Sequence, residues 1–357
     1  MRARLLRRFK NDKKYKVRRR VFSFSLFLAA VIGAVALGNR LTINSTQDEP
    51  ASVKPLSAKP PVVSQTEVTI QTESIPEIPK PEIPYPTADA STVQFADDVT
   101  SEYAVLVDVS SNKILAQRNS SARIYPASLT KVMTLIIAAE KATDTEKTFT
   151  MTNEIIDPLV RQDATRAGFE DGEAVKIIDM MYGAILPSGA DATVGLAKAL
   201  CGSESAFVEL MNEKAKALGL KDTHFVNTSG LHDSEHYSTP EDMAVILEYA
   251  MKNELCRKVL STYQYTTSPT QQHPNGILLE STMFSRMYGT EVENVTILGG
   301  KMGYTDEAGN CLASFAVKNG KEYVAVTTKG SGKYAPIFDS FKIYGNYIDH
   351  AQVAGAG

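Results

Sequence analysis

The pattern of hydrophobic and polar positions divides the chain into stretches of different character. Residues 21–39 are uncharged and nearly all apolar or small, whereas residues 40–95 show no sustained hydrophobic period. From about Ala96 onward, short alternating stretches and longer stretches with helical spacing follow one another to about residue 350. A period of two predicts strands, and a spacing of three to four predicts amphipathic helices. The sequence therefore predicts one folded domain over 96–350.

Strands are predicted near both ends of this domain. Alternating apolar residues indicate strands at 103–109, 114–117, 295–298, 311–317 and 322–327. The first two flank a turn at 110–113, and the last two flank Asn319-Gly320, a strong hairpin signal. We therefore expect the strands near the two ends of the domain to pair with each other in one antiparallel sheet.

Helices are predicted between these strands. Helical spacing of apolar residues covers 130–142, 177–186, 190–200, 205–218 and 240–252, and a last amphipathic segment covers about 335–348. The expected fold class is α/β: an antiparallel sheet flanked by helices, with the central insert forming a helical lobe. We expect the last helix to cover one face of the sheet.

The segment before the domain has the features of a membrane anchor. Residues 1–20 hold eleven of the 38 Lys and Arg residues against one acid, and 21–39 is long enough to span a bilayer. The basic flank predicts a cytoplasmic N-terminus and a single-pass signal anchor at the cell membrane, with the folded domain outside the cytoplasm. Ala34-Val35-Ala36 resembles a signal-peptide cleavage site, so secretion after cleavage is the alternative.

Residues 40–95 are rich in proline, serine, threonine and glutamate. Nine of the sixteen prolines lie there, and such a composition cannot bury enough apolar surface to offset chain entropy. It predicts a disordered, extended linker. The predicted organisation is a basic cytoplasmic tail at 1–20, a transmembrane helix at 21–39, this linker, and the folded domain at 96–350.

Charge and cysteine content exclude several classes of function. Without residues 1–20 the chain has 27 basic and 40 acidic residues, so nucleic acid is a poor partner. Cys201, Cys256 and Cys311 lie far apart with no CxxC pair, which argues against a redox motif, a zinc cluster or a disulfide framework. A single disulfide bridge is still possible, and because the number of cysteines is odd, at least one thiol is unpaired within the chain.

Ser128 and Lys131 form the first candidate for chemistry. They lie three residues apart where the helix at 130–142 begins, so their side chains share a face. A serine hydroxyl becomes a good nucleophile when a nearby base takes its proton, and a desolvated lysine beside another cation can be that base. The helix N-terminus also offers backbone N–H groups to a forming oxyanion. Taken alone, a Ser-x-x-Lys tetrad is weak evidence because many helices contain one.

Two further motifs make the signal specific. Ser128-Leu129-Thr130-Lys131 is followed by Leu186-Pro187-Ser188-Gly189-Ala190-Asp191-Ala192 and by Gly300-Lys301-Met302-Gly303-Tyr304-Thr305. In this order and spacing, the region from about Thr100 to Lys329 resembles the low-molecular-mass penicillin-binding D-alanyl-D-alanine carboxypeptidases of the serine–lysine class, related in fold to serine β-lactamases. The stretches 225–231, 236–239 and 307–312 are also similar to this family.

The resemblance implies a role for each motif residue. Ser128 would be the acylated nucleophile, Lys131 its general base, and Ser188 a proton relay to the departing D-alanine. Lys301 would lower the pKa of Lys131 and attract the terminal carboxylate of the substrate. The backbone N–H groups of Ser128 and Tyr304 would form the oxyanion hole, and the substrate-binding residues would be Lys301, Gly303 and Thr305. The family uses no metal or other cofactor, acts on peptidoglycan stem peptides, and is inhibited covalently by β-lactam antibiotics.

The chain departs from the family pattern at two positions. Ala190 replaces the usual asparagine of the second motif, and Met302 replaces the hydroxyl residue of the third. Loss of one charge-assisted hydrogen bond costs about 1.5 to 3 kcal/mol, roughly ten- to a hundredfold in the step that uses it. Thr305, two residues on, could supply a substitute hydroxyl. A weakened or inactive penicillin-binding scaffold is therefore the alternative function.

Two other enzyme classes fit parts of the sequence. His224, His232 and His236, with Asp233 beside them, suggest a zinc D,D-peptidase, but they fall in a predicted loop where i,i+4 spacing defines no helical face. A β-lactamase needs a carboxylate that positions water, and the stretch from Glu209 to Asn212 is a loose match to its motif. The carboxypeptidase remains the preferred prediction.

Overall fold

The computed structural model describes residues 83–287 and 292–349. The chain divides into two units, Met1–Ser74 and Ile75–Gly357, and all described residues belong to the second. The predicted anchor at 21–39 and the linker up to residue 82 lie outside the described residues. Within the described ranges, the structure contains no helix of the length and apolar character needed to cross a membrane.

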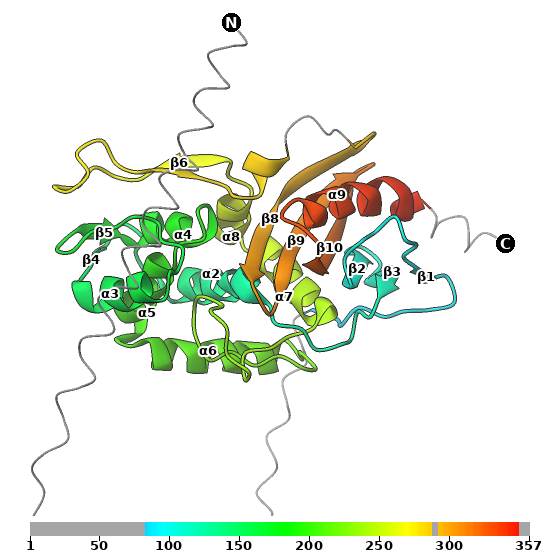
Figure 1. Cartoon of the computed structure of the whole chain (residues 1–357), viewed down its shortest axis with the longest axis horizontal. Helices are drawn as coiled ribbons and strands as arrows, with labels where there is room; N and C mark the ends of the chain where they lie inside the picture. The colour runs from blue at the N-terminus through cyan, green and yellow to red at the C-terminus, as the bar shows by residue number, and fades with distance from the viewer. Residues whose placement is uncertain (1–82, 288–291, 350–357) are drawn as a thin grey trace, which may run out of the picture. The chain divides into compact units, whose positions relative to one another are not determined.

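A six-stranded sheet forms the central layer of the domain, in the order β1-β3-β2-β10-β9-β8 (Figure 1). The strands are β1 Val93–Gln94, β2 Tyr103–Asp108, β3 Lys113–Arg118, β8 Val295–Thr305, β9 Gly309–Lys318 and β10 Lys321–Gly330. β2 and β10 pair antiparallel and so join the two ends of the domain, as the sequence predicts. β1 is a short addition that runs parallel to β3.

Both faces of this sheet are buried. Along β2, Ala104 and Leu106 belong to a hydrophobic cluster with Ile343 and Tyr344 at the C-terminal end, whereas Val105 and its neighbours belong to the larger core. Successive strand residues point to opposite faces, so the alternation places helices on both sides. Figure 1 shows α9 (Ala335–Lys342) on one side and α7 (Pro240–Lys252) on the other. α9 continues into a π-helical turn, Ile343–Tyr347.

The remaining helices form the lobe between the strands. They are α2 Thr130–Lys141, α3 Asn153–Arg161, α4 Ile177–Ile185, α5 Ala190–Cys201, α6 Glu204–Ala217 and α8 Glu254–Leu260. All six predicted helical segments are confirmed, with ends that differ by a few residues at most. α3 and α8 were not predicted, because Pro158 inside α3 reads as a helix breaker and α8 is only seven residues long.

Short elements connect the lobe to the sheet. β4 pairs with β5 and β6 with β7 in two small two-stranded sheets, and two 3₁₀ turns precede α2 and β8. Their bounds are β4 Thr148–Thr150, β5 Ala174–Lys176, β6 Gln264–Thr266, β7 Leu278–Glu280, η1 Ala127–Leu129 and η2 Phe284–Arg286. The turns η1 and η2 lie next to the central part of β8, where the third motif begins.

The packed domain begins earlier than the composition indicates. Ile83 is fully buried, Phe95 is 5% exposed, and the Tyr85 hydroxyl donates to Asp242 Oδ1 at 2.8 Å. Residues 83–95, assigned to the linker from their composition, therefore pack against the domain. Isolated apolar residues in a proline-rich segment carry no periodicity, so sequence patterning misses them although each occupies a buried position.

A buried carboxylate fixes α9 to the start of β2. Asp339 is 1% exposed and accepts hydrogen bonds from the backbone N–H groups of Thr100 and Ser101 at 2.9 and 2.8 Å. The hydroxyls of the same two residues also donate to it. Ser101 is fully buried whereas Thr100 is exposed, so loss of the carboxylate leaves the Ser101 N–H and hydroxyl without a partner.

We expect Asp339→Ala to reduce the free energy of unfolding by about 3 kcal/mol or more, because buried donors lose their acceptor. Asp339→Asn keeps one acceptor oxygen and should cost less. Urea denaturation followed by circular dichroism measures both effects, with Glu102→Ala as the exposed control nearby. An Ala variant with the wild-type midpoint would show that these bonds contribute no net stability.

Candidate active site

Ser128 lies in the tight turn η1 directly before α2. The preceding residue, Ala127, has φ +47, a conformation that non-glycine residues rarely adopt. Two glycines allow close approach on either side: a Cβ at Gly303 would lie 2.9 Å from Ser128 N, and one at Gly230 would lie 1.8 Å from Ala127 O. The turn is thus held between β8 and the loop that follows α6, and the strain at Ala127 is maintained by this packing.

The Lys131 amine meets the Ser128 hydroxyl one helical turn further on. Its Nζ lies 3.0 Å from Ser128 Oγ and donates to the backbone carbonyl of Ser229 at 2.5 Å. The side chain is only 2% exposed. Burial lowers the pKa of Lys131 to about 7, and the nearby Asp191 carboxylate partly opposes this shift. A large fraction of the amine is therefore neutral near pH 7, as a general base requires.

Lys301 lies beneath the cleft. It is 1% exposed, and its Nζ donates to Met302 O at 2.9 Å. Burial, followed by the positive charges of Lys131 and Arg286, lowers the pKa of Lys301 well below its ordinary value. Burial is the main cause of the lowered pKa at both amines, and the repulsion between them disfavours a charge on both at once. The resemblance implies a narrower role, in which Lys301 lowers the pKa of Lys131.

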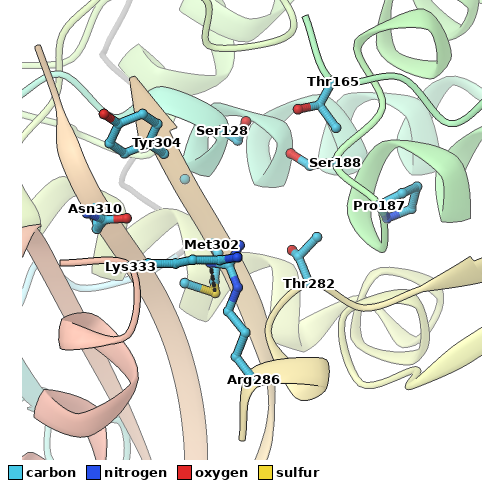
Figure 2. A pocket seen from close by; sticks show the side chains of 11 residues that line it. Ser128, Thr165, Pro187, Ser188, Thr282, Arg286, Met302, Tyr304, Asn310 and Lys333 are labelled. Atoms are coloured by element: carbon cyan, nitrogen blue, oxygen red, sulfur yellow. Dashed lines mark hydrogen bonds between the residues drawn. The ribbon is translucent and has the colours of Figure 1, made fainter. Parts of the chain in front are cut away.

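A cleft of about 520 Å³ opens beside Ser128 (Figure 2). Ser188, in the loop between α4 and α5, contributes a buried hydroxyl with no hydrogen-bond partner in the described part of the chain. Its backbone φ is +70, and Figure 2 shows its hydroxyl pointing to the side where Ser128 lies. A buried, unpaired hydroxyl facing a cleft is free to bind a reacting group.

Asp191 gives the second motif a structural role. Its carboxylate accepts backbone N–H bonds from Ala167, Gly168 and Phe169 at 2.7, 3.0 and 3.3 Å. These bonds hold the segment that carries Thr165 against the rim of the cleft. Ala190 is 2% exposed and, as the first residue of α5, brings no polar side-chain atom toward Lys131.

Met302 forms part of the cleft floor. It is 5% exposed and packs in a small cluster with Met283, Leu312 and Ile337. The Arg286 Nη1 lies 3.3 Å from its Sδ, so a guanidinium occupies the side of β8 where the family pattern expects a hydroxyl (Figure 2). Burial lowers the pKa of Arg286, but a guanidinium keeps its charge at neutral pH.

The last residues of the third motif separate into two groups. Gly303 and Tyr304 line the cleft, and the Tyr304 ring is largely exposed, with its hydroxyl donating to Asp306. Thr305 does not line it: its hydroxyl accepts the Ala308 N–H at 3.1 Å in the turn between β8 and β9. The hydroxyl considered as a substitute for position 302 is therefore engaged elsewhere.

Four cleft residues have no signal in the sequence: Thr165, Thr282, Arg286 and Lys333. Pro187 and Asn310, which also line the cleft, belong to stretches that resemble the family. Arg286 and Lys333 add two cations, and they come from segments before β8 and after β10 that no motif marks. Their position beside Met302 follows from the fold, which places both segments next to the middle of β8 (Figure 2).

The histidines considered as zinc ligands make unrelated contacts. His236 is 2% exposed and accepts the Val226 N–H on Nδ1 at 3.2 Å, so its proton lies on Nε2, which donates to Thr130 Oγ1 at 2.7 Å. Burial lowers its pKa to about 4. His224 contacts a backbone carbonyl, and His232 packs edge-on against Tyr125. Over 83–287 and 292–349, no three His, Cys, Asp or Glu side chains are grouped to hold a metal ion.

The loose β-lactamase motif lies away from the cleft. Asn212 exchanges two hydrogen bonds with the backbone of Phe225, and Glu209 is exposed on α6. Neither lines the cavity beside Ser128.

The three cysteines are free thiols, so the disulfide that the sequence left open is absent from the structure.

The fold and the site define the class. A sheet with helices on both faces, and a Ser–Lys pair at a helix start facing an edge strand, form the fold of penicillin-binding proteins and serine β-lactamases. Residues 89–331 match the family described as D-alanyl-D-alanine carboxypeptidase, peptidase family S11. The chain belongs to this family.

Named relatives and solved structures agree with this assignment. D-alanyl-D-alanine carboxypeptidase DacF of Bacillus subtilis is 35% identical over 227 residues, 62% of this chain and 56% of that protein. DacA of Escherichia coli is 31% identical, covering 65% and 57%. A mutant of the Streptomyces K15 DD-transpeptidase superimposes with a TM-score of 0.64 at 25% identity, covering 71% and 98%. The chain thus spans under two thirds of the length of these two curated relatives.

The lowered pKa of Lys131 predicts the pH dependence of Ser128 acylation. The rate should rise about tenfold per pH unit below pH 7 and level off above it, because only the neutral amine accepts a proton. Stopped-flow labelling with a β-lactam between pH 5 and 9 measures this profile. A rate that stays flat across this range would contradict the assignment of Lys131 as the base.

Proposed function

We propose that this protein is a serine-type D-Ala-D-Ala carboxypeptidase that removes the terminal D-alanine from peptidoglycan stem pentapeptides. The observation that carries the proposal is the 3.0 Å contact between the buried Lys131 amine and the Ser128 hydroxyl at the edge of an open cleft. Family membership over residues 89–331 supports the substrate class. The same nucleophile would open β-lactam antibiotics and be inhibited covalently by them.

Acylation begins with proton transfer from Ser128 to the neutral Lys131 amine. Ser128 Oγ then attacks the carbonyl carbon of the penultimate D-alanine, and the carbonyl oxygen becomes an oxyanion. The backbone N–H groups of Ser128 and Tyr304 stabilise this charge, which the close approach of Gly303 to Ser128 N supports. A proton on Lys301 beneath the floor would favour the oxyanion, and because repulsion disfavours charge on both amines at once, Lys131 would then be the neutral one.

Collapse of this intermediate breaks the peptide bond and releases D-alanine. The proton taken by Lys131 reaches the leaving amine through Ser188, whose unpaired buried hydroxyl accepts one proton and donates another. A water molecule then attacks the Ser128 ester with Lys131 again acting as base. Products are the shortened stem peptide and a free serine hydroxyl.

The leaving D-alanine carries a carboxylate, and the cleft offers cations to bind it. Arg286 lies beside Met302, and Lys333 lines the same side of the cavity. A guanidinium binds a carboxylate through two parallel hydrogen bonds, more strongly than a neutral hydroxyl does. Arg286 therefore compensates for the missing hydroxyl at position 302, and Gly303 leaves room for the substrate along β8.

The domain organisation is part of the proposal. A basic tail at 1–20, a transmembrane anchor at 21–39 and a proline-rich linker would hold the catalytic domain outside the cytoplasm, close to the cell wall. Excess acid in the remainder of the chain argues against nucleic acid as a partner. Protease protection of residues 1–20 in intact cells tests this topology.

Replacing the nucleophile tests the reaction itself. We expect Ser128→Ala to abolish release of D-alanine from a stem pentapeptide and labelling by a fluorescent penicillin, since both need the same oxygen. Chromatography and in-gel fluorescence of the protein measure the two outcomes, and circular dichroism verifies folding. Pentapeptide cleavage that persists in this variant, or a folded wild-type protein that neither cleaves nor labels, would sink the proposal.

A second prediction concerns the leaving-group carboxylate. Arg286→Ala should lower kcat/KM for the pentapeptide roughly ten- to a hundredfold, because a charge-assisted hydrogen bond is lost. Arg286→Lys should retain part of the activity. In a Met302→Thr background, Arg286→Ala should lower kcat/KM by a smaller factor, since the threonine hydroxyl would also bind the carboxylate of the substrate. The kcat/KM values of the wild type, the two single variants and the double variant give the coupling between the two positions. If Arg286→Ala lowered kcat/KM by the same factor in both backgrounds, Arg286 and position 302 would act independently.

A further inference from the structure

The Lys131 amine depends on a backbone carbonyl for its orientation. The structure records two hydrogen-bond partners for it within the described ranges, Ser128 Oγ and Ser229 O. Ala190 offers no polar atom to the amine. A neutral amine has two N–H groups and one lone pair, so an N–H held by Ser229 O restricts the directions in which the lone pair points. Orientation of the base toward Ser128 therefore rests on the position of Ser229.

Asn227 closes the turn that presents this carbonyl. Its Oδ1 accepts the backbone N–H groups of Ser229 at 3.1 Å and Gly230 at 2.7 Å, and its Nδ2 donates to Leu231 O at 2.9 Å. The side chain thus bonds to three consecutive residues. Because Gly230 packs against Ala127 O, the same turn also contacts the segment that carries Ser128.

Glu204 holds the turn from a different helix. Located at the start of α6, it accepts both the Thr228 N–H at 2.9 Å and the Thr228 hydroxyl at 2.7 Å on Oε1. The Thr134 hydroxyl of α2 donates to Thr228 O at 2.7 Å. Thr228 is fully buried and immediately precedes Ser229, so two helices fix its backbone.

Hydrogen bonds matter here because the turn, although its backbone at 228–230 is buried, borders a cavity on one side. Glu204, Asn227 and Ser229 line a second cavity of about 590 Å³, separate from the cleft beside Ser128. Open space beside the turn gives it room to shift if these bonds are lost. A displacement of about 1 Å of a catalytic group costs up to ~100-fold in rate.

We propose that Glu204 and Asn227 are positioning residues for acylation: through Thr228 and Ser229 they hold the Lys131 amine in line with Ser128, a task in which Ala190 has no part. This inference rests on the proposed function, because it assigns the two residues to the same acylation step. Neither side chain lines the cleft beside Ser128. Their effect therefore falls on the rate of the chemical step and leaves ligand binding unchanged.

The test uses acylation of the whole chain by a fluorescent penicillin, measured over a range of penicillin concentrations and from pH 5 to 9. Glu204→Ala should lower the maximal acylation rate about 10- to 100-fold and leave the half-saturating concentration unchanged. Glu204→Gln keeps the accepting oxygen and should stay within about threefold of wild type. Glu209→Ala, an exposed position on the same helix, is the matched control and should behave as wild type.

Thr228→Val provides a second variant that preserves side-chain shape and removes one of the two bonds to Glu204. It should give an intermediate loss in maximal rate, and it decides the question if the Ala variant does not fold. Wild-type rates in a folded Glu204→Ala or in Thr228→Val, or a loss in Glu204→Gln as large as in Glu204→Ala, would overturn the inference. A wild-type protein that does not react at all would overturn the proposed function, and this inference with it.

Discussion

Removal of the Lys131 amine from water is the constraint on which the site depends. Lowering its pKa from 10.5 to about 7 corresponds to roughly 5 kcal/mol of lost preference for the charged form. The fold achieves this by burying the side chain, whose amine donates to the carbonyl of Ser229 in the 225–231 loop. A surface lysine at the same spacing from a serine would stay charged and could not act as a base.

The same packing explains the local backbone. Ser128 reaches Lys131 and the cleft together because Ala127 adopts a positive φ, which is costly for a residue with a Cβ. Gly230 and Gly303 allow the loop and β8 to approach this turn from two sides. Strain at the nucleophile is thus offset by contacts from segments about 100 and 175 residues away along the chain. The site exists only when the helical lobe and the sheet are assembled.

Departures from the family pattern become interpretable in this setting. Met302 packs into an apolar cluster, and the Arg286 guanidinium of η2 lies beside it. Ala190 leaves the amine to the carbonyl of Ser229, itself held by side chains from a loop and from α6. In both cases a polar group from a segment far away in sequence lies where the motif lacks a polar side chain, a neighbour that motif comparison alone does not reveal.

The sequence by itself determined the periodicity, and with it the strands at both ends, the helices between them and the three motifs that carry Ser128, Lys131, Ser188 and Lys301. These features are local, since hydrophobic spacing and short motifs are written in consecutive residues. Tertiary structure alone decided the rest: that residues 83–95 pack on the domain, that Thr305 turns away, and that Arg286 and Lys333 enter the cleft. Those outcomes depend on which distant segments become neighbours, and burial, which sets the pKa of Lys131, is a property of the assembled fold.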